Sequence, residues 1–123
     1  MNVVTKKLIT AALAAVLLAL AAAPAPALAK SCRPVLNMFD GSRLEGSDSY
    51  RIRATGVSCS TARRVARQGT RRAVAATPNV DGFVRVRYRR WRVLDDLRGS
   101  TDRFRARASQ TKRISWLFGD AGR

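Results

Sequence analysis

Apolar and polar residues alternate along several short stretches of this chain, most clearly in its C-terminal third. The pattern covers residues 50–55, 83–88, 103–108 and 113–118. Because successive side chains of a β-strand point to opposite faces, each stretch predicts a strand with one buried and one solvated face. The residues on the expected core face are Tyr50, Ile52, Ala54, Val84, Val86, Tyr88, Phe104, Ala106, Ala108, Ile114, Trp116 and Phe118.

Between residues 55 and 83, small apolar residues recur every three or four positions instead of every two. Such spacing predicts a helix with one apolar stripe, and arginines take the other positions. The stripe consists of Cys59, Ala62, Val65, Ala66, Gly69 and Ala73. Ser58 or Ser60 can cap this helix, since a serine oxygen accepts from a first-turn N–H group. Gly69 lowers the helix propensity and predicts an early end or a bend.

The apolar phase moves by one residue after Tyr88, to Trp91 and Val93. This shift predicts a β-bulge near residues 89–90 or a break into two strands. Stretches rich in Pro, Gly, Asp or Ser predict turns at residues 77–82, 95–101 and 109–112.

Together these elements predict an α+β domain over residues 50–118, with one helix packed on a small antiparallel sheet of about four strands. Residues 30–49 are interrupted by proline and glycine and form an N-terminal arm, in which residues 35–39 are a strand or a packed segment. Residues 119–123 form a polar tail.

The first 29 residues have the order of a secretory signal peptide. Two lysines precede an apolar run from Leu8 to Ala23, and small residues follow at Ala27 and Ala29. We therefore expect cleavage after Ala29 and a mature protein that is secreted or held at the cell envelope. The alternatives are an uncleaved anchor, for which the apolar run is short, and a lipoprotein with lipid on Cys32.

Two cysteines, Cys32 and Cys59, remain in the expected mature chain. An even number of cysteines in an exported protein predicts a disulfide bond between them. The bond would help a chain that is too short to bury a large core.

The chain carries 24 Lys and Arg residues against 8 Asp and Glu residues, a formal net charge of +16. This excess favours an anionic partner, such as a cell-envelope polymer, a membrane surface, a nucleic acid or an acidic protein. Codon preference in a GC-rich genome is an alternative explanation. It accounts for arginine in place of lysine, but not for the surplus of arginine over acidic residues.

Strand alternation places many of the arginines opposite the core face. Guanidinium groups bind phosphates and carboxylates through paired N–H donors, so this face is a candidate anion-binding surface. The candidate residues are Arg51, Arg53, Arg103, Arg105, Arg107 and Arg113, with Arg85 and Arg87 as further members. Alternatively, the arginines only keep the solvated face of the sheet soluble.

Catalysis finds little support in the sequence. The chain has no histidine, the commonest general base and metal ligand. It also lacks a glycine-rich phosphate loop and a zinc-binding spacing. Asp95, Asp96 and Asp102 bracket one expected turn and could together hold Ca²⁺, although their spacing fits no EF-hand loop. We therefore expect neither enzyme activity nor a cofactor.

These observations predict a small exported basic domain that binds an anionic surface or polymer without catalysis. The alternative is an inhibitor or interaction domain for another exported protein, with residues 40–49 or 77–82 as the contact loop. The sequence identifies no small-molecule substrate.

Residues 56–67 read Gly-Val-Ser-Cys-Ser-Thr-Ala-Arg-Arg-Val-Ala-Arg. This segment resembles small exported bacterial proteins of unknown function that are common in GC-rich genomes and carry Gly-Val-Ser-Cys-x-Thr-Ala-Arg-x-Val-Ala. The resemblance extends loosely over residues 50–118. Those proteins carry cysteines where this chain has Val93 and Ala106, so their usual disulfide pairing does not carry over. The resemblance implies no activity and no catalytic residues.

Overall fold

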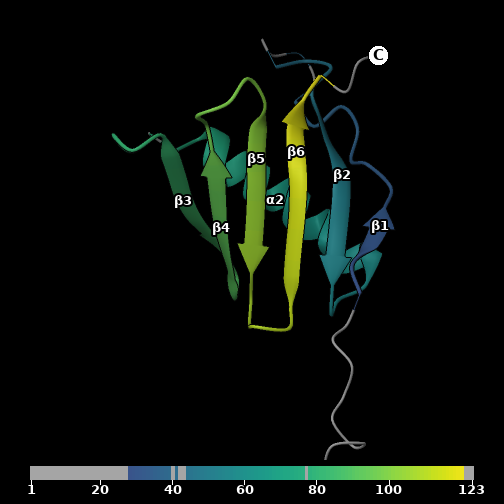
Figure 1. Cartoon of the computed structure of the whole chain (residues 1–123). Coiled ribbons are helices and arrows are strands. Elements are labelled where there is room, and N and C mark those ends of the chain that lie inside the picture. Colours follow the sequence, from purple (N-terminus) through teal and green to yellow (C-terminus); the bar gives the residue numbers. More distant parts are fainter. Residues whose placement is uncertain (1–27, 40, 42–43, 77, 121–123) are drawn as a thin grey trace, which may run out of the picture.

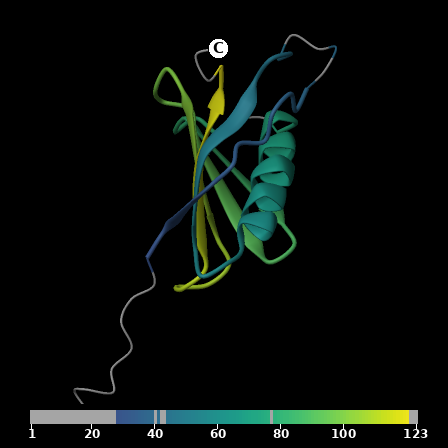
Figure 2. The ribbon, with the colours of Figure 1, turned by 90° about the vertical axis from the view of Figure 1, so that its right-hand side faces the viewer.

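An antiparallel sheet and one helix form two layers in the computed structural model, which describes residues 28–39, 41, 44–76 and 78–120 (Figures 1 and 2). The sheet has six strands in the order β1-β2-β6-β5-β4-β3, and every neighbouring pair is antiparallel. The helix covers one face of this sheet and leaves the other face open. The expected signal peptide lies almost wholly outside the described residues, as does most of the expected tail.

The elements follow one another along the chain with short connections, apart from the loop between β1 and β2. Their bounds are β1 Lys30–Cys32, β2 Asp48–Thr55, α2 Cys59–Val74, β3 Phe83–Tyr88, β4 Trp91–Asp96, β5 Asp102–Arg107 and β6 Arg113–Gly119. The α+β class is therefore confirmed, but the sheet has six strands rather than about four.

Two features account for the additional strands. β1 contains only three residues, which is too short for an alternating pattern to be recognised. The phase shift after Tyr88 is a break between two strands, because Tyr88 pairs directly with Trp91 across a two-residue turn. Arg89 in this turn has a φ of 53°, a conformation that hairpin turns require and that usually selects Gly or Asn. Because arginine occupies this position, the sequence has no glycine that marks the turn.

A bulge in β2 corrects the expected position of Tyr50. The pairing of β2 with β6 changes register between Tyr50 and Arg53, and Arg51 within the bulge has a φ of 50°. Tyr50 consequently pairs with Leu117, on the face away from the helix, and is only half buried. Ser49 takes the inward position instead, and Ile52 lies inward as expected.

The helix presents the stripe that the spacing predicts. Ser58 is the cap: its Oγ accepts from the N–H of Thr61 at 3.2 Å. The buried residues of the helix are Ala62, Val65, Ala66, Gly69, Thr70 and Ala73. The helix continues past Gly69 to Val74, so the early end that this glycine predicted does not occur. A Cβ atom there would lie 3.2–3.3 Å from the side chains of Val93 and Trp116, so glycine permits a close approach between helix and sheet.

The N-terminal arm is part of the fold rather than a separate extension. β1 pairs with β2, and Val35 and Met38 are buried with the core residues of the sheet. A disulfide bond joins Cys32 at the end of β1 to Cys59 at the start of the helix, with a Cα–Cα distance of 5.3 Å. The predicted Cys32–Cys59 pairing is therefore confirmed, and it fastens the edge strand to the helix layer.

Candidate anion-binding face

The open face of the sheet carries arginines on five adjacent strands, β2 to β6. All of them alternate with buried residues or lie in the β2 bulge, and all are exposed. They are Arg51 and Arg53 on β2, Arg113 on β6, Arg103, Arg105 and Arg107 on β5, Arg92 on β4, and Arg85 and Arg87 on β3. We call this set the arginine face.

Strand register arranges part of the arginine face into a row across the sheet. Arg87 pairs with Arg92, Arg92 with Arg107, and Arg107 with Arg113. Neighbouring strands are about 5 Å apart, and like charges directly opposite one another destabilise a sheet. This row therefore concentrates positive charge, and its guanidinium groups repel one another when no anion lies between them.

The next two rows mix arginine with apolar and small polar residues. Arg105 lies between Leu94 on β4 and Ser115 on β6, and Ser115 pairs in turn with Arg53. In the third row, Arg103 lies between Asp96 and Leu117. Hydrocarbon and hydroxyl groups thus lie beside the central guanidinium groups.

Carboxylates neutralise only one end of the arginine face. Among the described residues, ion pairs join Arg85 to Asp81 at 3.1 Å and Arg98 to Asp96 at 3.0 Å. The hydrogen bond from Arg98 holds the pKa of Asp96 at about 2, so this carboxylate is charged over the whole physiological range. Arg92, Arg105, Arg107 and Arg113 form no ion pair with any other described residue.

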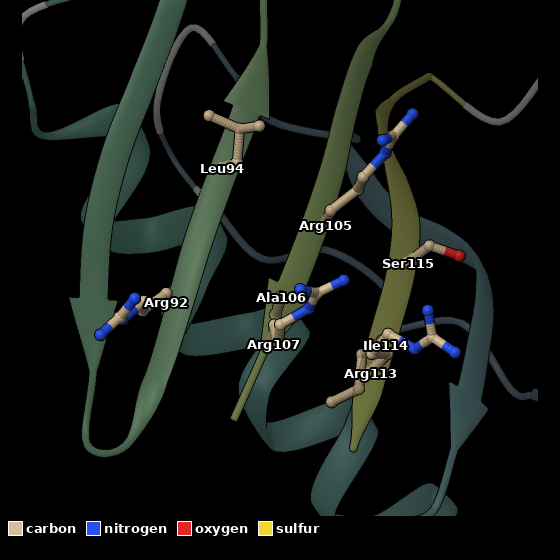
Figure 3. Close-up of a pocket in the computed structure, with 8 residues that line it drawn as sticks. All are labelled: Arg92, Leu94, Arg105, Ala106, Arg107, Arg113, Ile114 and Ser115. Carbon is tan, nitrogen blue, oxygen red and sulfur yellow. The ribbon is translucent and has the colours of Figure 1, made fainter. Parts of the chain in front are cut away.

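Two shallow depressions follow the face. One, of about 400 Å³, is lined by Arg92, Leu94, Arg105, Arg107, Arg113 and Ser115 together with Ala106 and Ile114. In Figure 3 the side chains of Arg105 and Arg107 extend from β5 toward β6. The other, of about 760 Å³, shares Leu94, Arg105 and Ser115 and continues to Arg51 and Arg103. The depressions therefore meet at Arg105.

The structure brings all six predicted anion-binding residues to this face. Five of them occupy regular outward strand positions, and Arg51 reaches the face from the bulge. Arg92 was missed, although it completes the row of arginines. The alternation of Trp91 and Val93 would have placed it outward once residues 89–90 were assigned to a hairpin turn.

The acidic residues do not form the calcium site that was considered from the sequence. Asp95 lies in β4 rather than in a turn, is only 2 % exposed and alternates with the buried Val93. Asp96 points to the opposite face and binds Arg98. No cluster of three potential metal ligands occurs in the part of the chain that the structure describes.

Burial raises the pKa of the Asp95 carboxyl group far above its usual value. Removal from water, together with the nearby charges of Asp102 and Asp96, raises the pKa of Asp95 from 3.8 to about 7. Burial also raises the pKa of Asp102, and a hydrogen bond between the two side chains opposes that rise. The two carboxyl groups thus share a site in which one of them holds a proton near neutral pH.

No protein-family model, curated protein or solved structure matches this chain. Among the described residues, no helix has the length and apolar character needed to cross a bilayer. The geometry of the arginine face therefore carries the functional argument.

Proposed function

We propose that this protein is an exported, non-catalytic domain that binds an anionic polymer of the cell envelope through the arginine face. The row formed by Arg87, Arg92, Arg107 and Arg113 supports the proposal most directly. Its members repel one another across neighbouring strands and have no carboxylate partner in the described part of the chain, so an anion lying over them would relieve that repulsion.

The layout of the face also weighs against composition as the whole explanation. Codon preference would scatter arginines over every exposed surface and does not require them to align in register. The helix layer also has a depression, of about 560 Å³, which is lined by Arg33, Arg63, Arg64 and Arg67. Those arginines come from the arm and one helix, whereas the arginines of the open face are aligned across neighbouring strands by their register. The disulfide is compatible with the oxidising compartment that export implies.

Two triple variants with equal loss of charge test the proposal. One changes Arg103, Arg105 and Arg107 on β5 to Gln. The other changes Arg64, Arg67 and Arg71, which are exposed on the helix, to Gln. Arg63 is left intact because its guanidinium donates to the carbonyl oxygens of Arg33 and Pro34 and holds the arm.

Binding to heparin and to long-chain polyphosphate is measured for both variants at low and high salt. We expect the β5 variant to lose most of the affinity and much of the salt dependence, because fewer counterions are released. The helix variant should retain most of both. Equal losses would mean that total charge, and not the arginine face, determines binding.

A further inference from the structure

β5 carries a ladder of three arginines through the middle of the arginine face. Arg103, Arg105 and Arg107 are alternate residues of this strand, so their Cα atoms are about 7 Å apart. β5 lies between β4 and β6 in the sheet, so outward side chains of these two strands flank the ladder on both sides.

This repeat matches that of one kind of anionic polymer. Alternate Cα atoms of a strand are separated by six covalent bonds of the backbone. Successive phosphorus atoms are also separated by six bonds when a three-carbon polyol links the phosphates, as in a glycerol phosphate polymer. Both chains reach about 7 Å per repeat when extended. Directly linked phosphates are much closer together, and five-carbon polyols space them farther apart.

We propose that the arginine face binds a single extended phosphodiester polymer with three-carbon polyol spacers, lying along β5 with successive phosphates at Arg107, Arg105 and Arg103. This inference rests on the proposed function and specifies its ligand. The phosphate at Arg107 is flanked by Arg92 and Arg113 and has the most donors. The phosphate at Arg105 lies between Ser115, whose hydroxyl group donates a hydrogen bond to it, and Leu94, which contacts the carbon atoms at the ends of the two adjoining spacers.

Single-stranded nucleic acid has the same bond count between phosphates, but the face lacks what binds its bases. Proteins that hold single strands stack the bases on aromatic side chains. The outward positions of β4, β5 and β6 carry no aromatic residue among those described, and Tyr50 on β2 is half buried beside Leu117 rather than along β5. Phe83 at the edge is covered by the guanidinium groups of Arg98, at 4.5 Å from the ring centroid, and Arg85, at 5.4 Å. The structure therefore favours a polyol phosphate.

The test compares oligomers that carry the same number of phosphates but differ in spacing. The probes are a glycerol phosphate oligomer, a 1,5-linked ribitol phosphate oligomer, linear polyphosphate and a single-stranded oligodeoxynucleotide. Binding to the folded, disulfide-bonded protein is measured by calorimetry in the same salt. We expect the glycerol phosphate oligomer to bind about tenfold more tightly than ribitol phosphate or polyphosphate, although polyphosphate has the higher charge density.

Single variants locate the polymer on β5. Arg105→Gln should lower the salt dependence of glycerol phosphate binding by about one released ion and remove the preference for this spacing. Arg64→Gln on the helix is the control of equal charge and should leave the preference intact.

The outcomes separate this inference from the proposed function. Affinity that follows charge density alone, with polyphosphate binding most tightly, would refute the spacing inference while leaving polyanion binding by the arginine face in place. Tighter binding of the oligodeoxynucleotide than of glycerol phosphate would also refute it, because bases would then contribute. Absence of binding to every probe, or equal loss in the two triple variants, would refute the proposed function itself.

Discussion

Trp116 on β6 donates a hydrogen bond from its indole Nε1 to Thr70 Oγ1 on the helix, with a distance of 2.9 Å. The hydroxyl group of Thr70 also lies 3.1 Å from Oγ of Ser49 on β2, so one buried side chain joins three elements. Trp116 stacks on Phe104 of β5 with ring centroids 4.9 Å apart. These contacts fix the register of β5 and β6 directly beneath the arginine ladder.

Replacement of Thr70 by Val should destabilise the domain. The shape of the side chain is retained, but the indole N–H loses its buried acceptor, which costs about 1–3 kcal/mol of unfolding free energy. The Ser49 hydroxyl loses one of its two partners and keeps Met38. Thr70→Ser keeps the hydroxyl group and should lose less. Urea denaturation measures both variants. Equal stability of Thr70→Val and the wild type would show that the hydrogen bond contributes nothing.

The stability of the wild-type protein should fall as pH rises from about 4 to about 7. Asp95 has a pKa of about 7 when folded and 3.8 when unfolded, so the folded state binds more protons in this window. Deprotonation of the buried group then removes up to about 4 kcal/mol of unfolding free energy. Asp95→Asn should have a flatter profile and greater stability at pH 8, measured by denaturation at each pH.

Asp96→Asn is the control for this pH profile because its effect has the opposite sign. The folded pKa of Asp96 is about 2, so its charge stabilises the domain above pH 4 and that contribution fades as pH falls. The Asp96 variant should therefore keep the loss of stability between pH 4 and 7. A wild-type stability that rises through this window would contradict the buried state of Asp95.

Loss of the disulfide bond should destabilise the domain through its unfolded state. Cys32 and Cys59 are 27 positions apart, and closing a loop of this length contributes about 3.5 kcal/mol in the chain-entropy model. Replacement of both cysteines by Ser should lower the urea midpoint to that of the reduced wild type. An unchanged midpoint in the double variant would show that the bond is dispensable.

Mass spectrometry of the protein exported by its producing cell should find Lys30 as the first residue. The charged start, short apolar run and small residues before position 30 motivate this expectation. Lys30 is also the first residue of β1, so cleavage after Ala29 would leave the sheet complete. A mature form that retains residues 1–29 would contradict it. Lipid on Cys32 would do so as well, because Sγ of this residue is bonded to Cys59.

Periodicity predicted the elements whose alternation or stripe is uninterrupted. β5, β6 and the helix are long enough for several repeats, and their buried residues agree with the expected faces. Periodicity failed at Tyr50, where the bulge shifts the phase without glycine, whereas at residues 89–90 it left open a bulge or a break and the structure shows the break. Asp95 was placed in a turn because aspartate is common there, whereas its burial depends on the partner strand and on Asp102.

The arginine face could be predicted only in part for the same reason. Alternation within one strand shows which side chains point outward, but register decides which of them become neighbours. The pairs Arg92–Arg107 and Arg107–Arg113 appear only when the strands are aligned. The same alignment makes Val93 and Ala106 cross-strand partners, the two positions at which the resemblance to small exported proteins implies cysteines. Membership of that group remains a prediction.

The two outer strands of the sheet are protected against self-association by different means. β1 is three residues long and covalently fastened, whereas β3 is protected by the charge of Arg87, since that of Arg85 is paired with Asp81. Charge protection lasts only while the charges are unscreened. A polyanion that binds many molecules of the protein side by side would neutralise this charge and bring their β3 strands together. The colloidal behaviour of the protein therefore depends on stoichiometry: we expect it to stay dispersed alone, coacervate near charge balance, and disperse again in excess polymer.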